Sequence, residues 1–439
     1  MSVNKMILYS IVFITVISAQ NVFPQRLKGG ELNLEQCIQI ALKNNPQILA
    51  SQIGVAELNK KIPQARAGFY PSLNFNADAG RLSEQPGYYG GKTGDNYNTS
   101  LSMRYNIFQG GKTVASLHAA RYNYEAGKSE FKANRQDLIL AVTEAYYQLL
   151  QAEQLTGVAE KSLQRAESHL DFANARFKNG LASRSDILKA KTEQSNAKLD
   201  LIHARNAVSL ARGQLNIALG HNVSSPIKIV DDLSKVAANE TEGNQSKFQT
   251  LVEEAHKKRP ELRKTEEQLL AQKSFIRISK ADYYPDVSLD ATYNFNGADV
   301  SQLYRSNYIG LSLSLPLFSG FSRPARVSQE KLHLQVLERQ QEALRQQISL
   351  EVWNAFLALK EVKERIGNTQ VFLKDAQENL DISEGEYKEG VGSMLDVLDA
   401  ETTFVAAQQR YIEALADYKI ARMVLQRAVS GKYFEEILK

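Results

Sequence analysis

The chain has 439 residues, with 53 Lys and Arg against 49 Asp and Glu, so its formal net charge is +4. This mixed charge, without a basic block, argues against a nucleic-acid-binding protein. Cys37 is the single Cys, which excludes an intrachain disulfide, and we interpret it as a packing residue. The length could hold two or three ordinary domains. Only 10 Pro are present, and long stretches without Pro or Gly favour long helices.

The N-terminus has the pattern of a secretory signal peptide. Lys5 precedes an apolar run over residues 6–17, and small residues follow through Ala19, which predicts a signal peptide over residues 1–19. The alternative is an uncleaved membrane anchor, but the run is shorter than the roughly 20 residues that span a bilayer. No later stretch is apolar enough for a membrane-spanning helix, so a membrane-bound product would need β-strands.

The two halves of the chain repeat the same landmarks. Asn45-Pro46 returns as Arg259-Pro260, and Tyr70-Pro71 returns as Tyr284-Pro285, each 214 residues later. Self-similarity of this length indicates a duplicated unit. We predict a first repeat, a polar crossover linker, a second repeat and a tail, over residues 20–220, 221–245, 246–431 and 432–439. A capping-box pattern starts a helix in each half, at Asn33-x-x-Gln36 and Ser246-x-x-Gln249.

After Pro71 and Pro285 the pattern changes to an alternation of apolar and polar residues. It predicts β-hairpins over about 70–108 and about 284–318, with the last strand continuing to Leu317. Each run is about 10 residues, the length that a tilted strand needs to cross a bilayer, and aromatic residues flank the runs. A half-buried soluble sheet would show the same alternation. The signal peptide, the matched lengths and the aromatic ends favour membrane strands.

Four such strands would be too few for a closed barrel, because single-chain barrels start at about 8 strands. An open sheet edge is not viable in lipid. Several chains would therefore share one barrel, with about 8 strands from two chains or about 12 from three.

A long helical pattern follows each hairpin, over about 112–220 and about 322–430. The stretch from Lys112 to Lys178 alone would form about 100 Å of helix at about 1.5 Å per residue. Apolar residues recur at intervals of three and four, which predicts a left-handed coiled coil. Alanine at every second seam position would allow neighbouring helices to approach closely.

Each long pattern is interrupted once, by Gly180 and by Gly390, in two related motifs that lie 210 residues apart. The motifs are Phe177–Ala190 (FKNGLASRSDILKA) and Tyr387–Ala400 (YKEGVGSMLDVLDA). We interpret both as sharp turns between helices, with Gly at the end of one helix and Ser or Asp at the start of the next. We expect the returning helices to start at Ser185 and Ser393.

Together, the duplication, the X-Pro elements, the paired hairpins and the motif at 390–400 resemble the TolC family of outer-membrane efflux proteins. The resemblance implies an α+β membrane protein. Long antiparallel coiled-coil hairpins would form an α-barrel, and four transmembrane β-strands per chain would complete a shared 12-stranded β-barrel in a homotrimer. It also implies a location in the Gram-negative outer membrane, in contact with its lipid, with a long periplasmic extension. The implied partners are a periplasmic membrane-fusion adaptor and an inner-membrane pump of the RND, ABC or MFS type.

Site residues can be carried over from the family one at a time. Matches to the family's periplasmic gate are Tyr387, Asp396, Asp399 and Asp186. Matches to its adaptor-docking turns are Gly180, Leu181, Ser185, Gly390, Val391 and Ser393. One departure concerns the family's gate arginine, whose position is Gly392 here. We therefore expect a leakier gate than in arginine-containing relatives, with Arg184 as a potential substitute.

Two other interpretations of the tip residues and of the whole chain remain open at this stage. Asp186 and Asp396 could cap the returning helices, whereas Asp399 lies a turn further in and could form a carboxylate ring that binds cations. The whole chain could also be a structural trimeric coiled-coil surface protein without transport activity. A surface protein of that class would have heptads that run in a single direction and one membrane segment at a terminus, whereas this sequence has internal hairpins.

Nothing in the sequence favours an enzyme. The six His are scattered without metal-ligand spacing, and Gly110-Gly111-Lys112-Thr113 lacks the first Gly of a phosphate loop because residue 106 is Asn. We expect no catalytic residue, cofactor, metal or nucleic acid. The sequence leaves open whether the duct would serve drug efflux, metal efflux or protein secretion.

Overall fold

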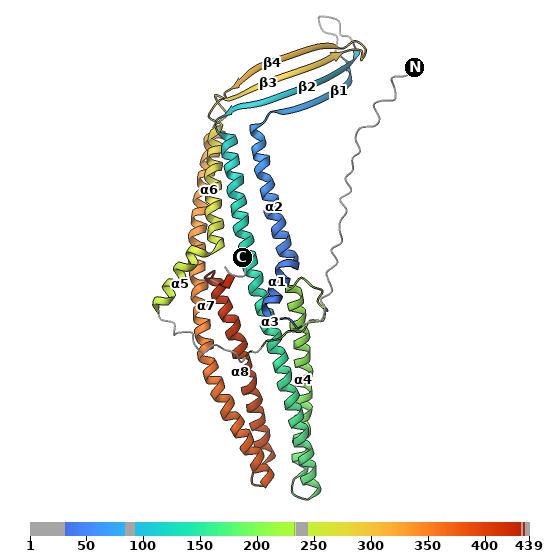
Figure 1. Ribbon diagram of the computed structural model, residues 1–439, viewed down its shortest axis with the longest axis vertical. Helices are drawn as coiled ribbons and strands as arrows, with labels where there is room; N and C mark the ends of the chain where they lie inside the picture. Colours follow the sequence, from blue (N-terminus) through green and yellow to red (C-terminus); the bar gives the residue numbers. More distant parts are fainter. Residues whose placement is uncertain (1–30, 84–92, 232, 234–244, 432, 435–439) are drawn as a thin grey trace, which may run out of the picture.

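The computed structural model describes residues 31–83, 93–231, 233, 245–431 and 433–434. The predicted signal peptide lies outside these residues, as does most of the predicted tail. Parts of the first hairpin loop and of the crossover linker lie outside them as well. Figure 1 shows an elongated molecule, with a sheet at one end and long helices that run away from it.

The sheet is antiparallel and has four strands in the order β1-β2-β3-β4. The strands are β1 (Ser72–Ser83), β2 (Thr93–Gln109), β3 (Asp286–Gly297) and β4 (Tyr304–Ser314). Apolar residues oppose one another in the register, as in Leu73 with Met103 and Leu289 with Leu311. Leu73 and Leu311 are 67% and 68% exposed, so one apolar face of the sheet is not covered by the chain. β1 and β4 are edge strands.

The last strand ends earlier than the sequence predicted. β4 ends at Ser314, and residues 315–318 are not part of a strand. Pro316 has no N–H to donate to a neighbouring strand. Strand pairing therefore does not continue through it, although apolar and polar residues still alternate there.

Shorter helices lie at mid-length or between mid-length and the sheet (Figure 1). They are α1 (Leu34–Asn44), α2 (Pro46–Arg66), the 3-10 turn η1 (Ala67–Phe69), α5 (Gln245–Lys258) and α6 (Pro260–Ala281). The capping box predicted at Asn33 and Gln36 is confirmed, since each side chain accepts the other's backbone N–H at 2.9–3.0 Å. Cys37 is fully buried, and burial raises the pKa of its thiol to about 12.

The duplication is visible in a pair of matching hydrogen bonds at mid-length. In the first half, Asn45 Nδ2 donates to the Ala218 carbonyl at 3.0 Å. In the second half, Arg259 Nη1 donates to the Ala428 carbonyl at 3.2 Å. In both halves, the residue before the helix-starting Pro thus binds the end of the returning helix.

Two long helical hairpins lead away from the sheet. The first consists of α3 (Lys112–Lys178) and α4 (Arg184–Ala218), and the second of α7 (Ser322–Glu389) and α8 (Met394–Ala428). Predicted seam alanines are buried, including Ala173, Ala190 and Ala407 at 0% exposure. Small side chains at the seam let the helices pack closely, as the 3.5-residue period predicted.

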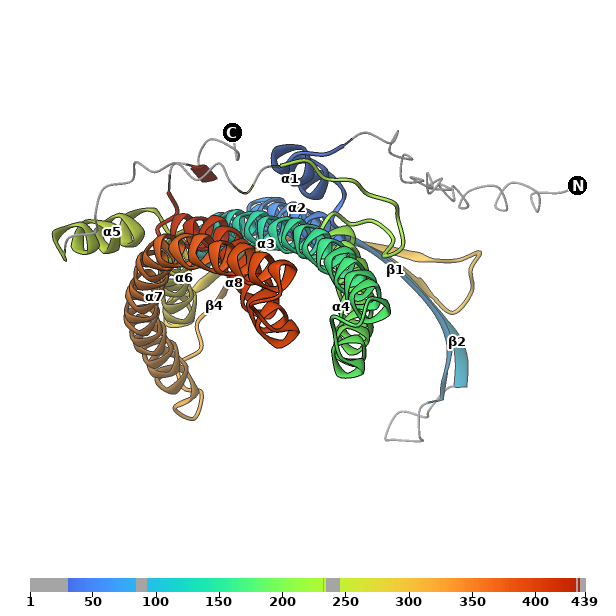
Figure 2. The same ribbon diagram turned by 90° about the horizontal axis from the view of Figure 1, so that it is seen from below.

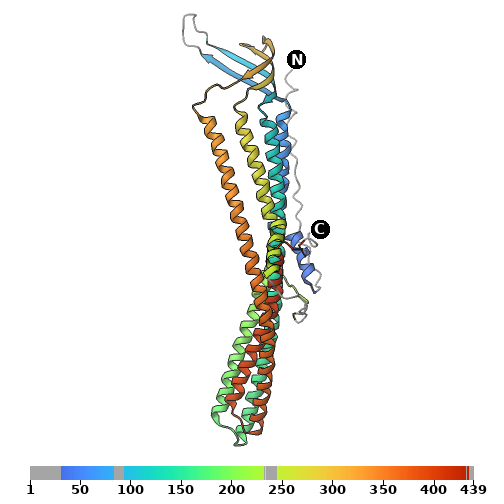
Figure 3. The same ribbon diagram turned by 90° about the vertical axis from the view of Figure 1, so that its left-hand side faces the viewer.

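The helices stand side by side along an arc (Figure 2). α6 packs against α3 and α7, and α8 packs against α3 as well as against its own partner α7. Figure 3 shows the long helices reaching from the sheet to two turns at the opposite end. In the part of the chain that is described, no helix combines the length and the apolar character needed to cross a membrane.

Candidate functional site at the helical turns

The first turn joins α3 to α4 through Gly180. Its φ of 74° lies in the left-handed region, where Gly avoids the strain of a side chain. The N–H groups of Gly180 and Leu181 donate to the carbonyls of Phe177 and Arg176 at 2.9 and 2.8 Å. These hydrogen bonds satisfy carbonyl groups at the C-terminus of α3 that would otherwise have no partner in the helix. Leu181 is 67% exposed, so an apolar side chain stands at the tip.

The second turn, between α7 and α8, has the same construction. Gly390 has a φ of 84°. The N–H groups of Val391 and Gly392 both donate to the Glu386 carbonyl at 3.0 Å. Val391 is 81% exposed and is the counterpart of Leu181. The two hairpins therefore end in matching turns with an apolar residue after the Gly.

The returning helices begin with capping boxes. Ser183 and Asp186 exchange backbone-to-side-chain hydrogen bonds at the start of α4, and Ser393 and Asp396 do so at the start of α8. The expectation that α4 starts at Ser185 is wrong: Ser183 is the N-cap, and Ser185 is an exposed residue in the first turn. Ser183, not Ser185, lies 210 residues before Ser393, so a strict count would have identified it.

The acidic residues divide into capping and free groups. Asp186 and Asp396 are helix-capping carboxylates, as one of the two sequence interpretations predicted. Hydrogen bonds from the Ser393 hydroxyl and then from its backbone N–H lower the pKa of Asp396. Asp399 lies one turn further along α8 and is exposed. Asp396 and Asp399 are three residues apart, so they share one face of the helix.

Tyr387 is buried, at 6% exposure, as its place on the apolar seam of the second hairpin predicts. It packs in a small apolar cluster from all four long helices, with Ala173, Ala190, Met394 and Val397. The edge of its ring meets Phe172 at 5.7 Å between centroids. Burial, and secondarily the charge of Asp186, raises the pKa of its hydroxyl. Tyr387 therefore joins the two hairpins just above their turns.

Arg176 is the residue at this site that sequence reasoning missed. From α3 it donates through Nη1 to the carbonyls of Tyr387 and Lys388, at the end of α7. Its guanidinium lies 4.9 Å from the centroid of the Tyr387 ring. A Cβ at Gly390 would lie 3.2 Å from Arg176 Nη2. No motif marked Arg176, because its partners are main-chain atoms of the other repeat.

The environment of Gly392 explains why a side chain is unfavourable there. A Cβ at Gly392 would lie 3.0 Å from Cβ of Glu386 and 3.2 Å from the Tyr387 nitrogen. Arg184, the substitute suggested by the sequence, is exposed on the first turn of α4. Within the described chain, the arginine beside the second turn is Arg176.

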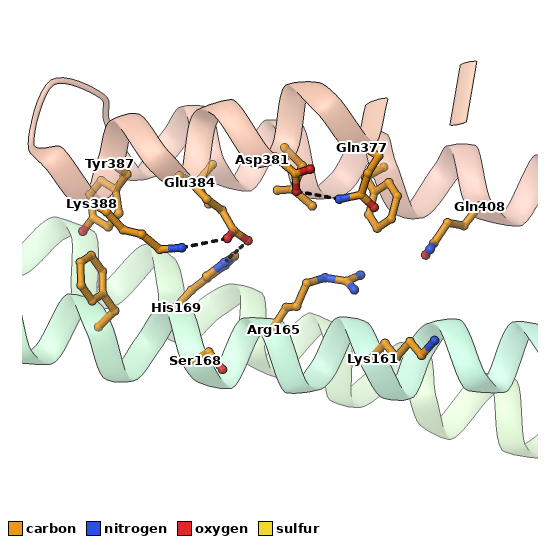
Figure 4. Close-up of a pocket in the computed structure, with 14 residues that line it drawn as sticks. Lys161, Arg165, Ser168, His169, Gln377, Asp381, Glu384, Tyr387, Lys388 and Gln408 are labelled. Atoms are coloured by element: carbon orange, nitrogen blue, oxygen red, sulfur yellow. Dashed lines mark hydrogen bonds and ion pairs between the residues drawn. The ribbon is translucent and has the colours of Figure 1, made fainter. Parts of the chain in front are cut away.

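Above the turns, α3 and α7 border a cavity of about 660 Å³ whose floor includes residues of α8. Figure 4 shows His169 from α3 and Lys388 from α7 both directed at Glu384, with contacts of 3.2 and 3.3 Å. Although burial opposes it, hydrogen bonds from His169 and Lys388 lower the pKa of Glu384 overall. The His169–Glu384 pair thus connects the two hairpins across this cavity, whereas Lys388 and Glu384 pair within α7.

A second tie connects α3 to α8 through Arg165, which also lines this cavity. Arg165 Nε donates to both carboxylate oxygens of Glu401 at 2.9 Å. Glu401 is 1% exposed, whereas the Arg165 side chain is 25% exposed. Removing one partner of such a buried pair leaves the other charge without compensation. Searched over the described residues alone, the chain shows no group of His, Cys, Asp and Glu arranged to hold a metal.

The comparisons with known proteins decide the family. The family model of the outer membrane efflux protein matches residues 37–221 and 251–431, which together make up most of the chain. The chain belongs to this family. It is an outer membrane efflux protein, a duct of the bacterial outer membrane that serves export, and this membership supports the duct over the structural coiled-coil stalk.

Similar proteins span nearly the whole efflux protein. Protein CyaE of Bordetella pertussis is 24% identical over 403 residues, covering 91% of this chain and 84% of CyaE. Outer membrane protein TolC of Escherichia coli is 24% identical over 424 residues, covering 92% and 84%. Both matches extend across the two repeats.

Solved structures share the fold of this efflux protein. A crystal structure of CusC superposes with a TM-score of 0.80 at 20% identity, covering 91% of this chain and 92% of CusC. The open state of the MtrE channel of Neisseria gonorrhoeae superposes with a TM-score of 0.76 at 23% identity, covering 91% and 89%. The mostly helical chain with a small antiparallel sheet is the shared architecture.

Proposed function

We propose that three copies of this chain assemble into one continuous duct. Four strands from each copy would complete a 12-stranded β-barrel, and the helical arcs would close into a tube below it. The observation that carries this proposal is the sheet itself: its apolar face is bare, and β1 and β4 are edge strands. Unpaired edges in lipid leave backbone groups without partners, and pairing between copies removes that cost.

The assembly is tested with purified protein in detergent. The expected result is an oligomer that runs at three times the monomer mass, collapses on heating, and opens pores in planar bilayers. A monomer by light scattering, or an oligomer that never conducts, would contradict the trimeric duct.

The turns would form the periplasmic gate and the docking surface for a partner. Leu181 and Val391 are exposed apolar residues at matching positions in the tips of the two hairpins. Single exposed apolar residues are common on protein surfaces, so the support for docking is that both turns repeat the same feature. The partner would be the helical hairpin of a periplasmic adaptor, which in turn contacts an inner-membrane pump of the RND, ABC or MFS type. Gly180, Ser185, Gly390 and Ser393 shape or flank these turns.

Docking can be tested with site-specific crosslinking. Cys37 is the only native Cys and is buried, so Leu181→Cys and Val391→Cys each introduce one reactive thiol. Both are expected to crosslink to a co-expressed adaptor. The matched control is Leu199→Cys on α4, which is 55% exposed but distant in sequence from the turns. Equal crosslinking at all three positions would argue against docking at the turns.

The proposed cargo is a small molecule, and the chain itself carries out no catalysis. The support comes from two similar proteins of Pseudomonas putida, which are a toluene efflux pump outer membrane protein and an antibiotic efflux pump outer membrane protein. Each is 21% identical over 418 residues. A deletion strain should accumulate such compounds. Normal efflux with loss of a secreted protein would instead favour protein secretion, and altered metal tolerance alone would favour metal efflux.

A further inference from the structure

One side of the helical arc carries a cluster of basic residues close to the sheet. On α6 the residues at positions 263, 266, 270, 273, 277 and 280 are all exposed, and their spacing of three and four places them on one stripe. Toward the sheet this stripe reads Lys273, Arg277 and Lys280. On α3, His118 borders one cavity of about 430 Å³ together with Arg277 and Lys280, and Arg121 is exposed one turn further along α3.

This stripe faces outward from the arc. On α6, the side chains that contact α3 and α7 include Lys264, paired with Glu130, and Gln272, bonded to Glu330. At about 100° per residue, the directions toward α3 and toward α7 divide the circumference of α6 into a narrow sector and a wide sector. In a curved row of helices, the wide sector faces the convex side of the row. Arg277 and Lys280 lie in the wide sector.

The cluster has little acidic compensation. Among the described residues, Arg121, Lys273, Arg277 and Lys280 form no ion pair with an acidic side chain. The nearest acidic positions on the same stripes are Glu125 and Glu266, further from the sheet. The cavity contains the N-terminus of α3 and the C-terminus of α6. Their helix dipoles have opposite signs there, so the positive potential comes from the basic side chains.

The height of the cluster relative to the sheet identifies its ligand. Tyr284 lines the same cavity and is 56% exposed, and Tyr283 and Phe108 beside it are 46% and 45% exposed. Aromatic residues at strand ends mark the membrane interface. Lys280 to Lys273 spans about 10 Å of helix below that level, which is the depth of a headgroup layer. Basic pockets at this depth bind lipid phosphates.

We propose that His118, Arg121, Lys273, Arg277 and Lys280, here called the α3–α6 basic cluster, bind the headgroup of an anionic phospholipid in the inner leaflet of the outer membrane. The phosphate would lie against Arg277 and Lys280, and Tyr284 would contact the glycerol region. The lipid would hold the junction of sheet and helices at a fixed depth. This inference rests on the proposed insertion of the sheet in lipid.

The test compares two variants that remove the same charge. Arg121→Gln/Arg277→Gln/Lys280→Gln neutralises the cluster. The control Lys189→Gln/Lys191→Gln/Lys198→Gln removes three exposed lysines of α4, near the turns. Each full-length protein is equilibrated in detergent with equal amounts of phosphatidylglycerol and phosphatidylcholine, re-isolated, and its bound lipid quantified by mass spectrometry. Flotation with phosphatidylcholine vesicles measures insertion separately.

The unmodified protein and the α4 control should retain phosphatidylglycerol in excess, and the cluster variant should lose most of that excess. Each removed charge is expected to lower retention about fivefold at low salt. Equal retention of the two lipids by the unmodified protein, or an unchanged excess in the cluster variant, would overturn the inference. Failure of the unmodified protein to float would instead contradict the proposed membrane insertion.

Discussion

Arg176 and Tyr387 link the two halves of the molecule at the end farthest from the sheet. The arginine donates to the Tyr387 carbonyl and stacks over its ring. A cation at the C-terminus of a helix also interacts favourably with its dipole. Because this contact ties the first hairpin to the second, Gly392 does not leave the turns without an arginine. The structure thus gives a reason to expect a tighter gate than Gly392 alone predicted.

The first prediction is that Arg176→Gln raises the resting single-channel conductance. A charge-assisted hydrogen bond to a carbonyl contributes about 1.5–3 kcal/mol, so its loss should shift the closed-to-open ratio about tenfold or more. Arg184→Gln, on the exposed first turn of α4, is the control and should leave conductance unchanged. Identical resting conductance in the two variants would show that Arg176 does not hold the gate.

The second prediction concerns block by multivalent cations. Three copies of Asp399 and Asp396 would form a carboxylate ring that binds such ions. Asp399→Asn should weaken block about tenfold, because it removes free carboxylates without disturbing a cap. Asp396→Ala should weaken block and also cost about 1 kcal/mol of helix stability, because it is part of a capping box. Asp171→Asn, an exposed acid on α3, is the control. Block that survives both substitutions would refute the ring.

The sequence predicted elements that depend on local periodicity. The start of α3 at Lys112, its end at Lys178 and the turn glycines follow from helical period, missing prolines and the left-handed conformation of Gly. The errors are also local in origin. Alternation predicts that β4 continues through Pro316, although Pro lacks the N–H that strand pairing needs. The motif likewise predicts a helix start at Ser185, although Ser183 is the position that fits the repeat.

Contacts between the repeats were beyond sequence reasoning. Arg176 binds main-chain carbonyls, which leave no trace in residue types. Glu401 is paired with Arg165, 236 positions away, and a single sequence does not reveal which charges meet across two hairpins. Tyr387 is matched to the gate by family resemblance and lies on the apolar seam of the second hairpin, so periodicity predicts its burial. Its contacts with residues of all four long helices could not be predicted in this way.

A third prediction tests the buried tie between Arg165 and Glu401. Glu401→Gln should lower the free energy of unfolding by about 3 kcal/mol, because breaking a buried ion pair leaves an uncompensated charge. The control is Glu160→Gln, whose partner Arg205 is 65% exposed, and it should cost under about 1 kcal/mol. The measurement is urea unfolding of the detergent-solubilised protein followed by circular dichroism. Similar losses in both variants would argue that the Glu401 pair is no stronger than a surface pair.

The last prediction uses two carboxylates whose pKa values move in opposite directions. The pKa of Glu384 is lowered, so its contribution to stability is present above the ordinary value of 4.5 and is lost as the pH falls through the folded value. The pKa of Glu193 is raised by burial and by the nearby Glu401. Its contribution is therefore present below 4.5 and is lost as the pH rises through the folded value.

At pH 7, Glu384→Gln should lower the melting temperature, whereas Glu193→Gln should raise it by removing an ionised, partly buried group. Thermal unfolding of both variants between pH 4 and pH 8 checks this. If the melting temperatures of both variants changed in the same direction at pH 7, the opposite pKa directions of Glu384 and Glu193 would be contradicted. Neutralising either carboxylate would then have the same effect, whatever its surroundings.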